Sequence, residues 1–100
     1  MNELVGPEKV YDVIAEMASK GKIVWVHFRN VRGQLPRFVE VFLDEGEADM
    51  KRAMETYRDN GFNGPFMMDH TPNIPGDRDQ REGHAYAVGF IRAMIQAVYR

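Results

Sequence analysis

Polar side chains that can bind ligands follow two short apolar runs of the chain. His27 follows the run 22–26, and the pair Asp69 and His70 follows the run 64–68. Both runs are rich in bulky or β-branched residues and begin at or next to a glycine, a pattern typical of buried strands. Ligands bind at the carboxyl ends of parallel strands in α/β folds. The pattern therefore predicts a metal or sugar site at this edge of a sheet, of which one histidine and one aspartate form only a part.

Arg29 stands two residues after His27, so both side chains share one face of an extended strand. A histidine and an arginine within an apolar segment need an anionic or metal-bound partner if they are buried. The pair therefore favours a site. The alternative for His27 is a buried histidine with a satisfied hydrogen bond.

The pair Asp69 and His70 has the chemistry of a ligand and of an acid or base. An aspartate after a buried strand can be a hard oxygen ligand, and histidine exchanges protons near neutral pH. The alternative is a turn or a helix cap at the start of a loop. Beyond that loop, the phenol of Tyr86 could donate a proton, whereas His84 is interpreted as an ordinary residue of a helix start.

Hydrophobic spacing and glycine or proline breaks divide the chain into six elements. In chain order they are helix, strand, strand, helix, strand and helix, at about 6–21, 22–29, 37–43, 47–60, 64–69 and 83–99. Apolar strands that alternate with helices predict a parallel sheet covered by helices, with 22–29 parallel to 64–69 and a right-handed connection between them. A closed (β/α)8 barrel takes about 250 residues. We therefore expect a piece of a larger fold, or a protomer that needs partners.

The alternation of side chains gives the first strand two faces. One is expected to pack on helices, and the other to look into a barrel or toward a neighbouring chain. The first carries Val24, Val26 and Phe28, and the second carries Trp25, His27 and Arg29.

The composition is that of one small globular unit. The chain has 100 residues and a formal net charge of −2, which gives little support for a nucleic-acid surface. It has no cysteine, so no thiolate metal ligand comes from these residues. The apolar runs are too short for a membrane span of about 20 residues, and the first residues lack a secretory signal. The expected location is the cytoplasm, with no membrane partner.

Five stretches of the chain resemble, in order and including loops, the mannonate dehydratase family. They are GKIVWVHFRNVRG at 21–33, FVEVFLDEGEADM at 38–50, GFNGP at 61–65, DHTP at 69–72 and YAVG at 86–89. The resemblance implies a single partial domain over residues 1–100, the C-terminal part of a (β/α)8 TIM barrel with about two βα units and a preceding helix. It also implies a hydro-lyase that removes water from D-mannonate to give 2-dehydro-3-deoxy-D-gluconate in hexuronate (glucuronate) catabolism.

The resemblance also assigns roles to individual residues. The family holds a divalent Mn or Fe ion with two histidines, a cysteine and an aspartate, and here His27 and Asp69 match two of these ligands. His70 and Tyr86 match positions of acid–base chemistry, and Arg29 matches a residue that meets the sugar-acid substrate. The ion can act as a Lewis acid while positioned acids and bases move the protons of a dehydration.

Three departures from the family pattern stand out. The thiolate ligand is missing, and the family's other ligand histidine would precede Met1. Met67 and Met68 stand where the family often has Arg-Pro, which removes one charge that faces the substrate. Asn30 stands where aspartate is common.

Three interpretations remain open from the sequence. The chain is part of a mannonate dehydratase; or it is a truncated, non-catalytic barrel fragment that only packs or oligomerises; or it belongs to another metal-dependent sugar isomerase or dehydratase on a similar barrel. The expected partners are a small sugar acid and either the remaining barrel segment or further copies of the chain.

Overall fold

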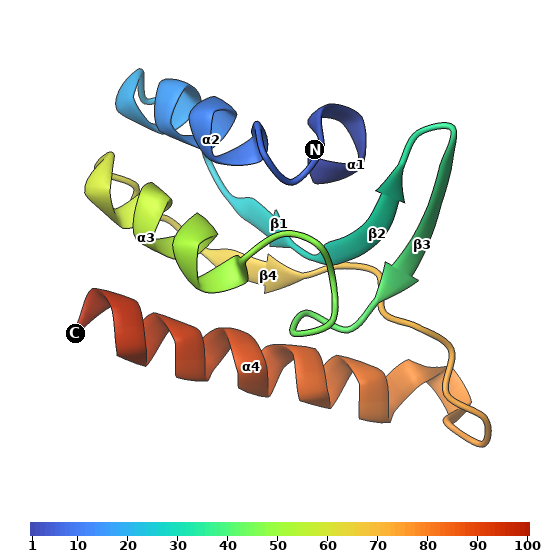
Figure 1. Ribbon diagram of the computed structural model, residues 1–100. Coiled ribbons are helices and arrows are strands. Elements are labelled where there is room, and N and C mark those ends of the chain that lie inside the picture. Colours follow the sequence, from blue (N-terminus) through green and yellow to red (C-terminus); the bar gives the residue numbers. More distant parts are fainter.

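The two apolar runs that carry the candidate residues pair as parallel strands. The computed structural model describes residues 1–100 and places β1 (Val26–Phe28) beside β4 (Phe66–Met68), with His27 opposite Met67 (Figure 1). The parallel pairing confirms the prediction. Each strand is shorter than its predicted range, because each has a single neighbour and the ladder extends only over their overlap.

Three helices pack in series behind this strand pair. α3 (Met50–Asp59) lies between α2 (Val10–Ser19) and α4 (Arg81–Tyr99) and contacts both (Figure 1). The chain passes from β1 to β4 through α3, so the parallel strands are joined by a helical crossover. No helix is long and apolar enough to cross a membrane.

The two faces of the first strand segment differ in burial, with one correction to the prediction. Val26 and Phe28 are buried in the core, as expected for the face that packs on helices. Val24 was expected beside them, but it is 76% exposed. The prediction is wrong there because the strand begins only at Val26, so the segment before it has no sheet neighbour to fix its face. Trp25, on the alternate face, is also exposed.

The start of the chain differs from the single helix that the sequence predicts. A short helix, α1 (Asn2–Val5), comes first, and α2 begins only at Val10. Gly6 separates them with φ of +83°, a left-handed backbone conformation that glycine adopts without strain. The hydrophobic periodicity of the sequence does not reveal α1, because none of the residues of this helix is buried.

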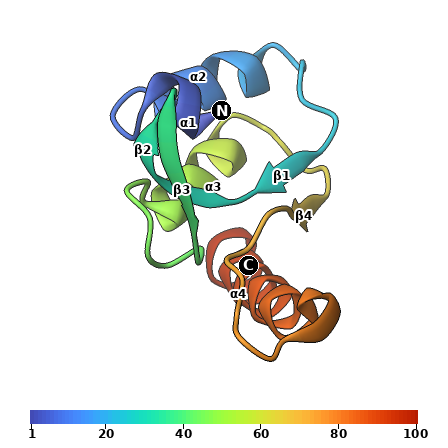
Figure 2. The same cartoon turned by 90° about the vertical axis from the view of Figure 1, so that its right-hand side faces the viewer.

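A hairpin follows β1 directly. β2 (Asn30–Gln34) pairs antiparallel with β3 (Arg37–Val41), and Figure 2 shows the hairpin beside α1 and away from β4. The sequence predicted the strand that starts at residue 37 but missed β2. Its polar residues and Gly33 suggested a break, whereas Gly33 sits opposite Phe38 in the ladder.

The core lies between the helices and the strand pair. It has 16 buried residues, which come from the helices, from β1 and from the segments before α3 and β4: Val10, Tyr11, Ile14, Ala18, Val26, Phe28, Leu43, Ala48, Met50, Ala53, Met54, Tyr57, Phe62, Ala87, Ile91 and Val98. The fold is therefore of the mixed α/β kind.

One buried polar side chain, Asn30, holds the segment after the hairpin in place. Its amide nitrogen donates to the carbonyl oxygens of Leu43 (3.0 Å) and Ala48 (2.9 Å). Its carboxamide oxygen accepts from the backbone N–H groups of Val31 (3.0 Å) and Ala48 (3.3 Å). A Cβ at Gly46 would overlap this carboxamide, so the segment can pass closely over Asn30 only with glycine there.

Replacing Asn30 by Ala should lower the free energy of unfolding by about 2–4 kcal/mol, because buried backbone groups lose their partners. Urea denaturation measures the change. Asn63→Ala is the matched control: Asn63 is exposed and makes no hydrogen bond through its side chain, so a change within about 0.5 kcal/mol is expected. Equal effects of the two substitutions would contradict the role of Asn30.

Candidate functional site

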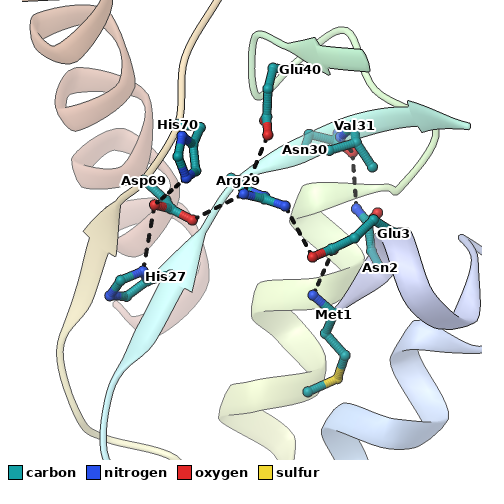
Figure 3. Close-up of polar contacts among 10 residues, drawn as sticks. All are labelled: Met1, Asn2, Glu3, His27, Arg29, Asn30, Val31, Glu40, Asp69 and His70. Atoms are coloured by element: carbon teal, nitrogen blue, oxygen red, sulfur yellow. Dashed lines mark hydrogen bonds and ion pairs between the residues drawn. The ribbon is translucent and has the colours of Figure 1, made fainter. Parts of the chain in front are cut away.

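The candidate residues meet where β1 and β4 end. His27 lies within β1, Arg29 follows this strand, and Asp69 and His70 follow β4 (Figure 3). The parallel register places the two strand ends side by side, so residues 40 positions apart in sequence come into contact. Four of the five predicted site residues therefore lie together.

The two carboxylate oxygens of Asp69 face different partners. Oδ1 lies 3.6 Å from Nδ1 of His27 and 3.6 Å from Nε2 of His70, while Oδ2 lies 3.4 Å from Nη1 of Arg29. Figure 3 shows the carboxylate of Asp69 between the imidazoles of His70, above it, and His27, below it, with the guanidinium of Arg29 to its right. The side chain of His27 is 51% exposed, so the simple alternative of a buried histidine does not hold.

Arg29 is the centre of an ion-pair cluster that the sequence did not reveal. Its side chain is only 17% exposed and contacts three carboxylates, at 3.0 Å from Glu3, 3.3 Å from Glu40 and 3.4 Å from Asp69. Its guanidinium also lies over the ring of Phe38, 5.8 Å from the ring centre. The predicted anionic partner of Arg29 is thus present, and it comes from the chain itself.

Sequence reasoning missed Glu3 and Glu40. Glu40 interrupts an otherwise apolar part of β3, which is a signal that could have marked it, and its Oε2 atom is buried without a hydrogen-bond partner. Glu3 lies on a helix of only four residues, none of them buried, so no local pattern marks it.

Glu3 has a second cationic neighbour. Its Oε2 atom lies 2.7 Å from the terminal ammonium of Met1, while Oε1 faces Arg29. Burial raises the pKa of Glu3, but hydrogen bonds from the ammonium and the backbone, together with both positive charges, lower it more, so the pKa lies below its ordinary value of 4.5.

A cavity of about 170 Å³ opens beside this cluster. Polar side chains line one part of it, among them Glu3, His27, Arg29 and Asp69, and core residues such as Phe28 line the rest. Small-molecule sites usually measure about 300–1,000 Å³. The residues around this cluster therefore enclose less space than a typical ligand site.

Tyr86, the fifth predicted residue, lies apart from the cluster. Its ring packs edge-on against Phe42 with ring centres 5.2 Å apart, and it lines a second hollow with Asp44 and Glu45. A hydrogen bond with Asp44, loss of solvent and the nearby negative charges raise the pKa of Tyr86, so the phenol keeps its proton at neutral pH. Its role in proton transfer stays a prediction.

His27 and Asp69 fit two positions of a metal site. Two ligand atoms on one divalent ion, each at about 2.1 Å, lie roughly 3.0–3.5 Å apart, and the facing atoms of these side chains are 3.6 Å apart. No group of three or more His, Cys, Asp or Glu side chains is arranged to hold a metal ion. The spacing of His27 and Asp69 thus allows two ligands to one ion, and no third side chain completes a set.

Fold and site define a mixed α/β protein whose imidazole, carboxylate and guanidinium groups meet at the ends of parallel strands. The family model described as D-mannonate dehydratase (UxuA) matches residues 4–98. The chain therefore belongs to the D-mannonate dehydratase family, whose members are hydro-lyases by that description. No individual curated protein matches the chain.

The lowered pKa of Glu3 predicts a pH-dependent contribution to stability. Because the folded pKa lies below the unfolded one, the ionised carboxylate stabilises the fold above about pH 4.5, and this contribution disappears as the pH falls through the folded pKa. The free-energy difference between the protein and its Glu3→Gln variant should therefore be largest near pH 7 and shrink toward pH 3, measured by urea denaturation.

Glu8→Gln is the control for this experiment, because it removes the same charge from an exposed residue that makes no ion pair. Its effect on stability should be small throughout. A Glu3→Gln effect that does not change with pH would contradict the ionic role of Glu3.

Proposed function

We propose that this chain is the C-terminal part of a D-mannonate dehydratase, which converts D-mannonate to 2-dehydro-3-deoxy-D-gluconate in hexuronate breakdown. The observation that carries the proposal is the convergence of His27, Arg29, Asp69 and His70 at the ends of β1 and β4. The resemblance of the sequence assigns these four residues to the family's site, and they lie within the residues 4–98 that the family model matches.

The strand pair supports a partial (β/α)8 barrel. β1 and β4 each have one neighbour, so one edge of each strand is open. Purely parallel sheets are stable when both faces are covered, yet the His27 side chain is 51% exposed and Met67 is 47% exposed, on the face away from the helices. We propose that further barrel strands, from the remaining barrel segment or from other copies of the chain, cover this face and enlarge the cavity.

In the proposed enzyme, His27 and Asp69 are two ligands of a divalent Mn or Fe ion. Such an ion, when bound, supplies Lewis-acid polarisation of substrate oxygens. The contact of Asp69 Oδ2 with Arg29 leaves Oδ1 directed to the imidazole side of the cluster, so Arg29 orients the carboxylate. The cysteine and the second histidine come from the remaining barrel segment.

The dehydration requires two proton transfers. The bond between carbon 2 and its hydrogen breaks, the hydroxyl on carbon 3 leaves as water, and the resulting enol becomes the 2-oxo product. His70 is exposed at the site and suits proton transfer near neutral pH. The protonated phenol of Tyr86 suits donation to the leaving hydroxyl, provided that the complete site brings it near the substrate.

A non-catalytic fragment that packs or oligomerises is the second candidate function. One observation favours it: no three ligand-type side chains of the chain are arranged around a common point. On either proposal the 100-residue chain by itself should be inactive, so the two differ in what happens when the missing segment is supplied.

The test mixes the purified chain with the remaining barrel segment of a family member that carries the cysteine and the second histidine. With D-mannonate and Mn²⁺ or Fe²⁺, the chain alone should give no measurable product, because stable sites for such ions draw on three or more side chains. The mixture should produce the 2-oxo acid, and His27→Ala or Asp69→Ala should reduce turnover by at least about 1,000-fold.

His84→Ala is the matched control, because His84 contacts only Gln80 on its own helix turn and should leave turnover within about twofold. Association of the two pieces is followed separately by size-exclusion chromatography. A complex that forms but stays inactive would support the non-catalytic fragment, and robust turnover by the chain alone would show that other residues make the site.

A further inference from the structure

Arg29 cannot take a further anion while its present partners stay in place. One guanidinium faces three carboxylates, and with the Met1 ammonium the cluster still carries a formal excess of negative charge. A fourth carboxylate would bring like charges together in a partly buried place, which is unfavourable. An anionic ligand of Arg29 must therefore replace one of the three.

Of the three carboxylates, Glu3 is the one that a ligand can reach and replace. Glu40 does not line the cavity, and its residue is held in the β2–β3 ladder opposite Val31. Asp69 lines the cavity but is also held between the two imidazoles. Glu3 lines the cavity, and its carboxylate is held by Met1, by Arg29 and by a hydrogen bond from the nearby backbone.

The helix that carries Glu3 can stay in place while this side chain moves. The backbone oxygen of Glu3 accepts a hydrogen bond from Leu35 N–H at 2.8 Å, and the amide of Gln34 donates to the Leu4 oxygen at 3.1 Å. The side chain of Asn2 donates to Asn30. These three contacts fix α1 to the hairpin without using the Glu3 carboxylate, so rotation of this side chain breaks only its bonds to Arg29, to Met1 and to the nearby backbone.

We propose that Glu3 is an internal stand-in for a ligand carboxylate: it occupies Arg29 in the free protein and is displaced when a sugar acid or similar small carboxylate binds. The exchange replaces one carboxylate by another, so the charge beside Arg29 is unchanged. The identity of the ligand as D-mannonate rests on the proposed function, whereas the exchange at Arg29 does not.

The test measures carboxylate binding to the whole chain rather than catalysis. D-mannonate, D-gluconate and acetate are titrated separately into the ¹⁵N-labelled protein and into Glu3→Gln, and the Arg29 side-chain signal is followed by NMR. Glu3→Gln keeps the size of the side chain but weakens the competitor, so Kd should fall by roughly 3- to 30-fold, the effect of losing one charge-assisted contact.

Two controls separate this exchange from a general change of charge. Glu8→Gln removes the same charge from an exposed residue without an ion pair and should leave Kd within about twofold. In the unmodified protein, labelled with ¹³C as well as ¹⁵N, ligand addition should also shift the carboxyl signal of Glu3 while the Leu35 amide signal changes little, which tests the displacement without any substitution.

The outcomes are distinct for the two proposals. Equal Kd values for the protein and Glu3→Gln, or no carboxylate binding to either, would overturn the exchange at Arg29. Tighter binding of all three carboxylates without preference for D-mannonate would support the exchange and count against the substrate of the proposed function. Tighter binding led by D-mannonate would support both.

Discussion

β1 and β4 have only each other as sheet neighbours, so their parallel contact alone brings the two halves of the site together. The ladder is short, and its first bond runs from Val26 N–H to the Pro65 oxygen at 3.0 Å. Phe66 strengthens it, because its ring packs edge-on against Phe28 and against Tyr57 of α3. The helices thus hold the strands in register, and the register sets the distance between His27 and Asp69.

Charge pairing links this strand edge to parts of the chain that make little hydrophobic contact with it. Arg29 connects α1 through Glu3, β3 through Glu40 and the end of β4 through Asp69. Arg29 is largely shielded from water. The loss of one carboxylate partner therefore changes the electrostatic field at the other two more than it would in an exposed ion pair. The arginine therefore couples the site to the hairpin and to α1.

The strand pair packs against a buried core on one side and is exposed on the other. Behind the strands, the helices and the buried Asn30 close a well-packed core. On the other side, the side chain of His27 and the residue Met67 are exposed, and the cavity beside Arg29 measures about 170 Å³. Helices therefore cover one face of the strand pair, and the other face has no cover within the chain.

The sequence by itself determined the parallel strand pair, the helices that cover it and the positions of His27 and Asp69, because apolar periodicity and glycine breaks are local signals. It did not determine α1 or β2, whose residues lack an apolar pattern, nor the exposure of Val24, which follows from a missing neighbour strand. Only the tertiary structure decided that Glu3 and Glu40 surround Arg29 and that Tyr86 lies apart from the cluster. The Glu3 contact joins residues 26 positions apart, and such long-range charge pairing leaves no periodic mark in a single sequence.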